Sequence, residues 1–135
     1  MKLPESLRLH HIGCLTEDME ASLNNYVNIL GFRKASAITV ISHQQVKVCF
    51  VEVAPDVYLE LVQPTGENPA LTKILKSKNP YYHTGYLVKD ISATIVQLQA
   101  EGYYLVNRFI SEAFENKECA FLYTSEMHLI EIIEY

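Results

Sequence analysis

Two eight-residue stretches, HIGCLTED at residues 11–18 and HTGYLVKD at residues 83–90, decide how the fold of this sequence is interpreted. Both carry a histidine, a glycine, a leucine and an aspartate in the same frame, 72 residues apart. Each stretch is short and largely apolar, which is typical of a strand, and each ends near a residue that can cap a helix: Thr16 or Asp18 in the first, and Asp90 in the second. The two stretches therefore predict two strand-to-helix units of the same design.

The repeat continues downstream of both stretches, where the spacing falls to 71 because the first predicted helix is one residue longer. It pairs Gly31 with Gly102, Phe50 with Phe121 and Glu60 with Glu131. Residues rich in β-branched and aromatic side chains predict three strands after each helix, over 32–42, 46–53 and 57–63, and over 103–110, 117–124 and 128–134. Each half is thus expected to have the order βαβββ.

The length of 135 residues suits one compact domain, residues 1–135. We expect two modules, residues 8–63 and 81–135, joined by a connector over 64–80 that contains a short helix. Two repeats are too few for a solenoid, so the pattern indicates a pseudo-twofold arrangement of two half-sheets. The fold class is therefore α+β.

The composition excludes several classes of protein. A net charge of −5 argues against nucleic-acid binding, which needs a basic surface. The sequence has no apolar run that could span a membrane and no signal-peptide core at its start. Three widely spaced cysteines (Cys14, Cys49 and Cys119) do not form a zinc motif and are expected to be buried thiols in a reducing compartment, which predicts a cytoplasmic protein.

Each half offers one histidine in its first strand and one glutamate in its last: His11 with Glu60, and His83 with Glu131. Both glutamates lie between two aliphatic residues, in LELV (59–62) and IEII (130–133). Because side chains alternate between the faces of a strand, the aliphatic neighbours are expected to enter a core and the carboxylates to lie on the opposite face.

Two imidazoles and two carboxylates form a ligand set suited to a divalent cation such as Ni²⁺, Co²⁺, Zn²⁺, Mn²⁺ or Fe²⁺. Such an ion can polarise a carbonyl, and a carboxylate can then remove a proton from the adjacent carbon. Taken singly, a strand histidine is more often a packing residue, and a glutamate in an alternating strand is usually solvated. Recurrence of both polar residues in both halves is harder to explain by packing, and it favours a functional site.

With these residues identified, the chain resembles the vicinal oxygen chelate superfamily, also called the glyoxalase / bleomycin-resistance / dioxygenase fold. The resemblance covers residues 8–135 and rests on HHIGCLTEDMEASLNNYVNILGF, VYLELVQPTGENPALTKIL, YYHTGYLVKDI and HLIEIIEY. It implies paired βαβββ modules that form a curved, mostly antiparallel sheet around a metal ion. The metal ligands that it implies are His11, Glu60, His83 and Glu131, with Glu131 or Glu60 as the catalytic base.

Within the superfamily, LELVQPTGENPALTKIL is similar to methylmalonyl-CoA epimerases, while the complete His–Glu–His–Glu set is similar to glyoxalase I enzymes. The run Asn79-Pro80-Tyr81-Tyr82-His83 departs from the glycine- and histidine-rich segment typical of the epimerases. The resemblance implies a metal-dependent isomerase or epimerase acting on a small carbonyl or thioester substrate, and a homodimer. The alternatives are a glyoxalase I (lactoylglutathione lyase) reaction on a hemithioacetal, or a small-molecule binding or resistance protein without turnover.

Overall fold

The computed structural model describes residue 3 and residues 7–135. The described chain divides into two compact units: His11–Tyr82 forms one, and His83–Tyr135 forms the other together with the described residues before His11, which are residue 3 and residues 7–10. No helix within the described ranges is long and apolar enough to cross a membrane.

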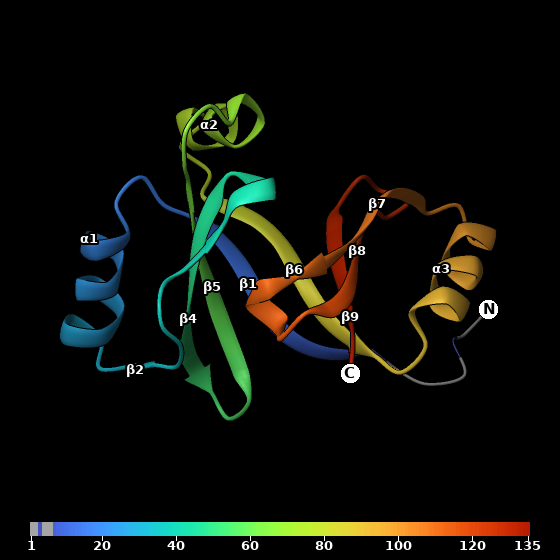
Figure 1. Ribbon diagram of the computed structural model, residues 1–135, viewed down its shortest axis with the longest axis horizontal. Coiled ribbons are helices and arrows are strands. Elements are labelled where there is room, and N and C mark those ends of the chain that lie inside the picture. The colour runs from blue at the N-terminus through green and yellow to red at the C-terminus, as the bar shows by residue number, and fades with distance from the viewer. Residues whose placement is uncertain (1–2, 4–6) are drawn as a thin grey trace. The chain divides into compact units, whose positions relative to one another are not determined.

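The unit His11–Tyr82 follows the predicted order of elements with one difference. The segment 32–42, expected to be one strand, forms two short ones, because the Ser36 hydroxyl accepts a hydrogen bond from the Phe50 backbone N–H (2.9 Å) and interrupts the ladder. Its elements, shown in Figure 1, are β1 (Arg8–Leu15), α1 (Met19–Leu23), the π-helix η1 (Asn24–Ile29), β2 (Arg33–Lys34), β3 (Thr39–Ile41), the 3₁₀-helix η2 (Ser42–Gln44), β4 (Val46–Ala54), β5 (Val57–Pro64) and α2 (Pro69–Lys76).

The second unit has the predicted order βαβββ. Its elements are β6 (Tyr81–Val88), α3 (Ile91–Ala100), β7 (Tyr104–Ser111), the 3₁₀-helix η3 (Glu112–Phe114), β8 (Lys117–Tyr123) and β9 (Leu129–Glu134). The prediction of an α+β fold is confirmed.

The two units share one topology. In the first, β5 pairs antiparallel with β4 and parallel with β1, so the strand that opens the module lies beside the strand that closes it. In the second, β9 pairs antiparallel with β8 and parallel with β6. Each opening histidine and each closing glutamate are thereby carried by neighbouring strands, although about fifty residues separate them in the sequence.

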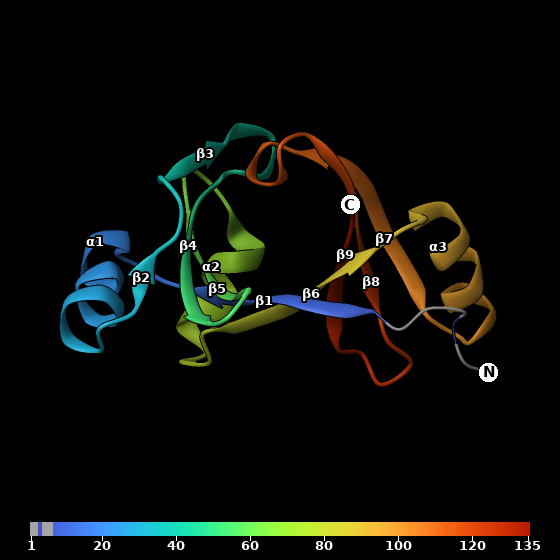
Figure 2. The same ribbon diagram turned by 90° about the horizontal axis from the view of Figure 1, so that it is seen from below.

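One face of each sheet is covered by the helix of the same unit, as Figure 2 shows for α1 and α3. The apolar core of the first unit contains Met19 and Leu23 of α1 together with Cys49, Val51 and Leu61 of β4 and β5. The core of the second unit consists of Val88, Ile91, Ile95, Leu98, Ala120, Leu122, Ile130 and Ile132. Burial of these side chains fixes which face of each strand is turned away from the helix.

The extra residue of the first module is accommodated inside its helix. After Leu23 the α-helix continues as the π-helix η1, in which the Leu30 N–H donates to the Asn25 carbonyl five residues earlier (2.9 Å). The corresponding helix α3 is α-helical throughout its ten residues. A single inserted residue widens a helix locally in this way, so the change of repeat spacing from 72 to 71 has a structural counterpart.

Candidate metal centre

The first module brings together the two residues that the sequence pairs. His11 lies on β1 and Glu60 on the neighbouring β5, and His11 Nε2 lies 3.6 Å from Glu60 Oε1. His11 is completely buried and Glu60 is 5% exposed. Buried ionisable groups are costly unless they are paired or bind a metal, so this pair is not an ordinary solvated strand face.

The second module repeats this arrangement. His83 of β6 places its Nε2 3.3 Å from Oε1 of Glu131 on β9. Both residues are buried, with exposed fractions of 1% and 3%. In both modules Nε2 is the ring nitrogen that faces the carboxylate.

The expected division of the strand faces is confirmed within each module. Leu61 and Ile132, which follow the two glutamates, are buried in the helix-side cores of their units. Glu60 and Glu131, one residue earlier, therefore lie on the opposite face of their sheets. Both carboxylates are buried, so they are not the solvated side chains that an alternating strand usually has on its outer face.

The strand register surrounds each glutamate with the same two neighbours. In the first module, Glu60 lies opposite Gly13 of β1 on one side and opposite Phe50 of β4 on the other. In the second module, Glu131 lies opposite Gly85 of β6 and Phe121 of β8. The glycine of the repeated His-x-Gly motif is thus the residue that leaves space beside the carboxylate.

Each histidine also contacts the phenylalanine that faces its glutamate. The His11 and Phe50 rings meet edge to face, with centroids 5.8 Å apart and an interplanar angle of 70°. The His83 and Phe121 rings do the same at 5.2 Å and 87°. The sequence showed that Phe50 and Phe121 correspond in the repeat, but this contact depends on strand pairing, which the sequence alone did not reveal.

The donor atoms of each pair fit a shared divalent ion. Each histidine offers one ring nitrogen and each glutamate one carboxylate oxygen. Two donors that are both about 2.1 Å from one cation lie about 3.0–3.4 Å apart at octahedral or tetrahedral angles. The separations of 3.6 Å and 3.3 Å are close to this range. The chemistry of the residues therefore fits a metal ion of the kind that the sequence predicts.

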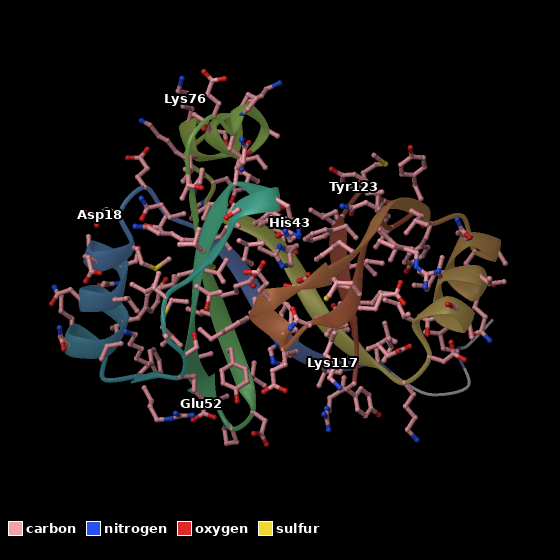
Figure 3. The ribbon with its side chains drawn as sticks, viewed as in Figure 1. Asp18, His43, Glu52, Lys76, Lys117 and Tyr123 are labelled. Carbon is pink, nitrogen blue, oxygen red and sulfur yellow. The ribbon has the colours of Figure 1, made fainter. Side chains whose placement is uncertain are left out.

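The repeated aspartates serve the helices. Asp18 lies at the start of α1 (Figure 3), and its carboxylate accepts a hydrogen bond from the Ala21 N–H (3.2 Å). Asp90 accepts from the Ala93 N–H in the same position of α3 (3.0 Å). Of the two candidate caps at the first helix, Asp18 is thus the N-cap.

A second pair of side chains supports the same helix starts and was missed in the sequence. Gln63 Oε1 accepts from the Met19 N–H (2.8 Å), and Glu134 Oε2 accepts from the Ile91 N–H (3.0 Å). Both residues lie three positions after a candidate metal ligand, on β5 and β9. The sequence did contain a signal for this pair, because Gln63 and Glu134 are separated by the same 71 residues as the two glutamates.

The remaining histidines, two tyrosines and Cys14 are not part of these two pairs. His43 and His128 are exposed, and His10 is half-buried and packs edge to face against Phe114. Tyr86 and Tyr103 pack against the helix-side core of the second unit, not on the face that carries His83. Cys14 lies on the helix side of β1, where burial, and after it the negative charge of Glu60, raise the pKa of its thiol.

Known proteins share this fold. A crystal structure of a hypothetical protein from Bacillus halodurans C-125 matches with a TM-score of 0.85 and 25% identity, covering 97% of this chain and 96% of the other. Methylmalonyl-CoA epimerase from Mycobacterium tuberculosis matches with a TM-score of 0.84 and 21% identity, covering 99% and 92%. The Streptomyces coelicolor methylmalonyl-CoA epimerase in complex with 2-nitronate-propionyl-CoA matches with a TM-score of 0.82 and 23% identity, covering 96% and 98%. The likeness to these two epimerases is one of fold.

The sequence comparisons give the family. The uncharacterized protein YqjC of Bacillus subtilis (strain 168) is 29% identical over 130 residues, covering 94% of this chain and 91% of the relative. Residues 10–122 match the family of glyoxalases, bleomycin resistance proteins and dioxygenases, a span that includes three of the four candidate ligands. By this match and by its paired modules, the chain belongs to the Glyoxalase/Bleomycin resistance protein/Dioxygenase superfamily.

Proposed function

We propose that this protein is a divalent-metal-dependent isomerase that moves a proton on a carbon next to a carbonyl, as an epimerase does. The observation that carries the proposal is the buried His–Glu pair, present in both modules with the same strand register. Two buried pairs supply two imidazole nitrogens and two carboxylates, and two carboxylates would balance the charge of one divalent cation. We propose that His11, Glu60, His83 and Glu131 hold this ion together, either within one chain or across the two chains of a dimer, and that residues 1–135 form a single domain.

A divalent ion in this site would polarise the carbonyl of the substrate and acidify the neighbouring C–H bond. Glu131 or Glu60 would act as general base toward that carbon, or would leave the ion transiently to do so. His11 and His83 would present Nε2 to the ion. The burial of these four side chains would limit the access of bulk water to the reacting carbon, which would protect the substrate from side reactions.

A thioester of coenzyme A is the proposed substrate class. Two of the similar structures are epimerases with a coenzyme A thioester or its analogue bound, methylmalonyl-CoA in one and 2-nitronate-propionyl-CoA in the other. The candidate ligand set allows a second reaction, because its two histidines and two glutamates also resemble the glyoxalase I set. That reaction, on a thiol hemithioacetal, is the alternative.

Metal content and two assays test the proposal. Wild-type protein loaded with Ni²⁺ or Co²⁺ is expected to retain the ion through gel filtration, and Glu131→Gln protein is expected to lose most of it. Proton–deuterium exchange on methylmalonyl-CoA would identify the epimerase, whereas product formation from methylglyoxal and a thiol would identify glyoxalase I. Wild-type protein that retains no ion under any loading would contradict the metalloenzyme and favour a binding protein without turnover.

Two further features belong to this proposal. We expect a homodimer, which light scattering coupled to size-exclusion chromatography measures directly. We also propose a reducing, cytoplasmic environment, supported by three cysteine thiols that form no disulfide bond with one another, two of them buried. Labelling of thiols in freshly lysed cells would test that expectation, because a reduced protein reacts at all three cysteines after denaturation.

A further inference from the structure

We infer that Phe50 and Phe121 are positioning residues, each holding the histidine of its own module in the orientation in which Nε2 faces the glutamate. The inference rests on the proposed metal site, because ring orientation matters for function only if Nε2 is a ligand atom. It concerns two residues that do not themselves offer a metal donor.

The geometry is the same in both modules. Phe50 and Phe121 lie directly opposite the glutamates in the antiparallel ladders β4–β5 and β8–β9. Each ring meets its histidine edge to face, at centroid distances of 5.8 Å and 5.2 Å. In each module, the imidazole is therefore contacted by a carboxylate and a phenyl ring that lie on two adjacent strands.

An imidazole needs such a contact because its own torsion does not fix it. Rotation about the Cβ–Cγ bond of histidine has a broad, two-fold preference. A rotation of the ring out of its present plane would turn Nε2 away from the carboxylate. Edge-to-face packing depends on the angle of the ring, since the positive edge of one ring meets the negative face of the other. The phenyl rings therefore resist rotation of the imidazoles out of the plane in which Nε2 faces the glutamate.

The phenyl rings are themselves supported. Phe121 stacks on Phe109 of β7, with centroids 5.4 Å apart and an interplanar angle of 22°. Phe50 meets Tyr58 of β5 edge to face at 6.1 Å and 74°. Residues that hold metal ligands commonly affect metal affinity without touching the ion. A phenyl ring that is itself packed against a second aromatic ring is suited to that role.

The chain supplies a matched control. His10 and Phe114 form a third edge-to-face pair, at 5.5 Å and 71°, in the unit that contains His83. His10 precedes His11 on β1 and therefore lies on the other face of the strand. It is not a candidate ligand. Loss of the Phe114 ring removes a contact of the same kind and leaves the proposed ligands untouched.

The experiment compares Phe50→Leu, Phe121→Leu and Phe114→Leu with wild type in Co²⁺ titrations, followed by calorimetry and by the visible absorption of the ion. We expect Phe50→Leu and Phe121→Leu to bind Co²⁺ roughly tenfold more weakly, with altered band positions. Phe114→Leu is expected to bind like wild type, and Phe121→Tyr, which keeps the ring, to restore most of the affinity. The inference would be overturned if Phe50→Leu and Phe121→Leu both bound Co²⁺ with the affinity and the absorption spectrum of the wild-type protein.

Crystal structures of the metal-free wild-type and Phe121→Leu proteins provide the second measurement. The inference expects the His83 ring to be turned or disordered in the variant while the strands are unchanged. A ring that keeps Nε2 toward Glu131 would overturn it. A wild-type protein that binds no Co²⁺ would contradict the proposed metal site instead, and the metal-free structures would still decide whether the phenyl ring sets the orientation of the histidine.

Discussion

The repeated glycines show how a single residue can shape this face of the sheet. Gly13 and Gly85 lie directly opposite Glu60 and Glu131 in the parallel ladders, two residues after the histidines of the same strands. Opposite residues of a sheet have Cβ atoms about 5 Å apart on the same face. Any side chain at either glycine would therefore stand against a buried carboxylate. The two glycines therefore place no side chain beside the candidate ligands.

We predict that Gly85→Val weakens Co²⁺ binding by at least about tenfold, because its methyl groups would displace the Glu131 carboxylate from His83. The control is Thr84→Val, a substitution of similar volume at the preceding residue, which lies on the opposite face of β6. Calorimetric titration of both proteins measures the effect. Equal affinities in Gly85→Val and Thr84→Val would show that the space beside Glu131 is not needed.

At the scale of elements, each module joins its closing strand to the start of its helix. In α3 the Ala93 N–H donates to Asp90, and the Ile91 N–H donates to Glu134 of β9 (3.0 Å each). In α1 the Ala21 N–H donates to Asp18 and the Met19 N–H to Gln63 of β5. The first N–H groups of a helix have no partner within it, so these side chains complete the helix and bind it to the sheet.

We predict that Asp90→Ala lowers the free energy of unfolding by about 1 kcal/mol, because the cap of α3 is lost. Glu134→Ala is expected to lower it by about 1–3 kcal/mol, because the part-buried Ile91 N–H loses its acceptor. Urea denaturation measures both changes. Asp90→Asn, which retains an acceptor oxygen, is the control and should stay close to wild type.

Measuring Co²⁺ affinity distinguishes the helix-capping role of Asp90 and Glu134 from a role in metal binding. Both alanine variants are expected to bind the ion like wild type, since the repeated aspartate caps a helix. A variant that kept full stability but lost metal binding would contradict the capping role of its residue.

For the whole chain, the repeat was sufficient to predict two modules and the pairing of each histidine with its glutamate. Hydrophobic alternation was sufficient to predict which face carries the carboxylates. What the sequence could not provide depends on strands meeting in register: the phenyl rings of Phe50 and Phe121 against the imidazoles, and the capping by Gln63 and Glu134. The division of segment 32–42 also required the structure, because one hydroxyl, that of Ser36, replaces a backbone partner.

The stability of the folded chain is expected to depend on pH through two cysteines of the first unit. Burial is the main cause that raises the pKa of Cys14 and of Cys49, because a thiolate is poorly solvated there. Above the unfolded pKa of about 8.5 the unfolded chain loses protons that the folded chain retains. The contribution of the two thiols to the free energy of unfolding is therefore fully present below that pH. It is lost as pH rises toward the folded pKa values, by at most about 1.4 kcal/mol per pH unit for each thiol.

Urea denaturation from about pH 7.5 to about pH 9.5 measures this loss, and the variant carrying Cys14→Ala and Cys49→Ala isolates it. The two proteins differ only at these two positions, so the difference in slope is assigned to the two thiols. The variant is expected to be less stable at neutral pH, because the Cys49 side chain fills a fully buried position, but to lose less stability as pH rises. Parallel curves for the two proteins would mean that neither thiol holds its proton more tightly in the folded chain than in the unfolded one.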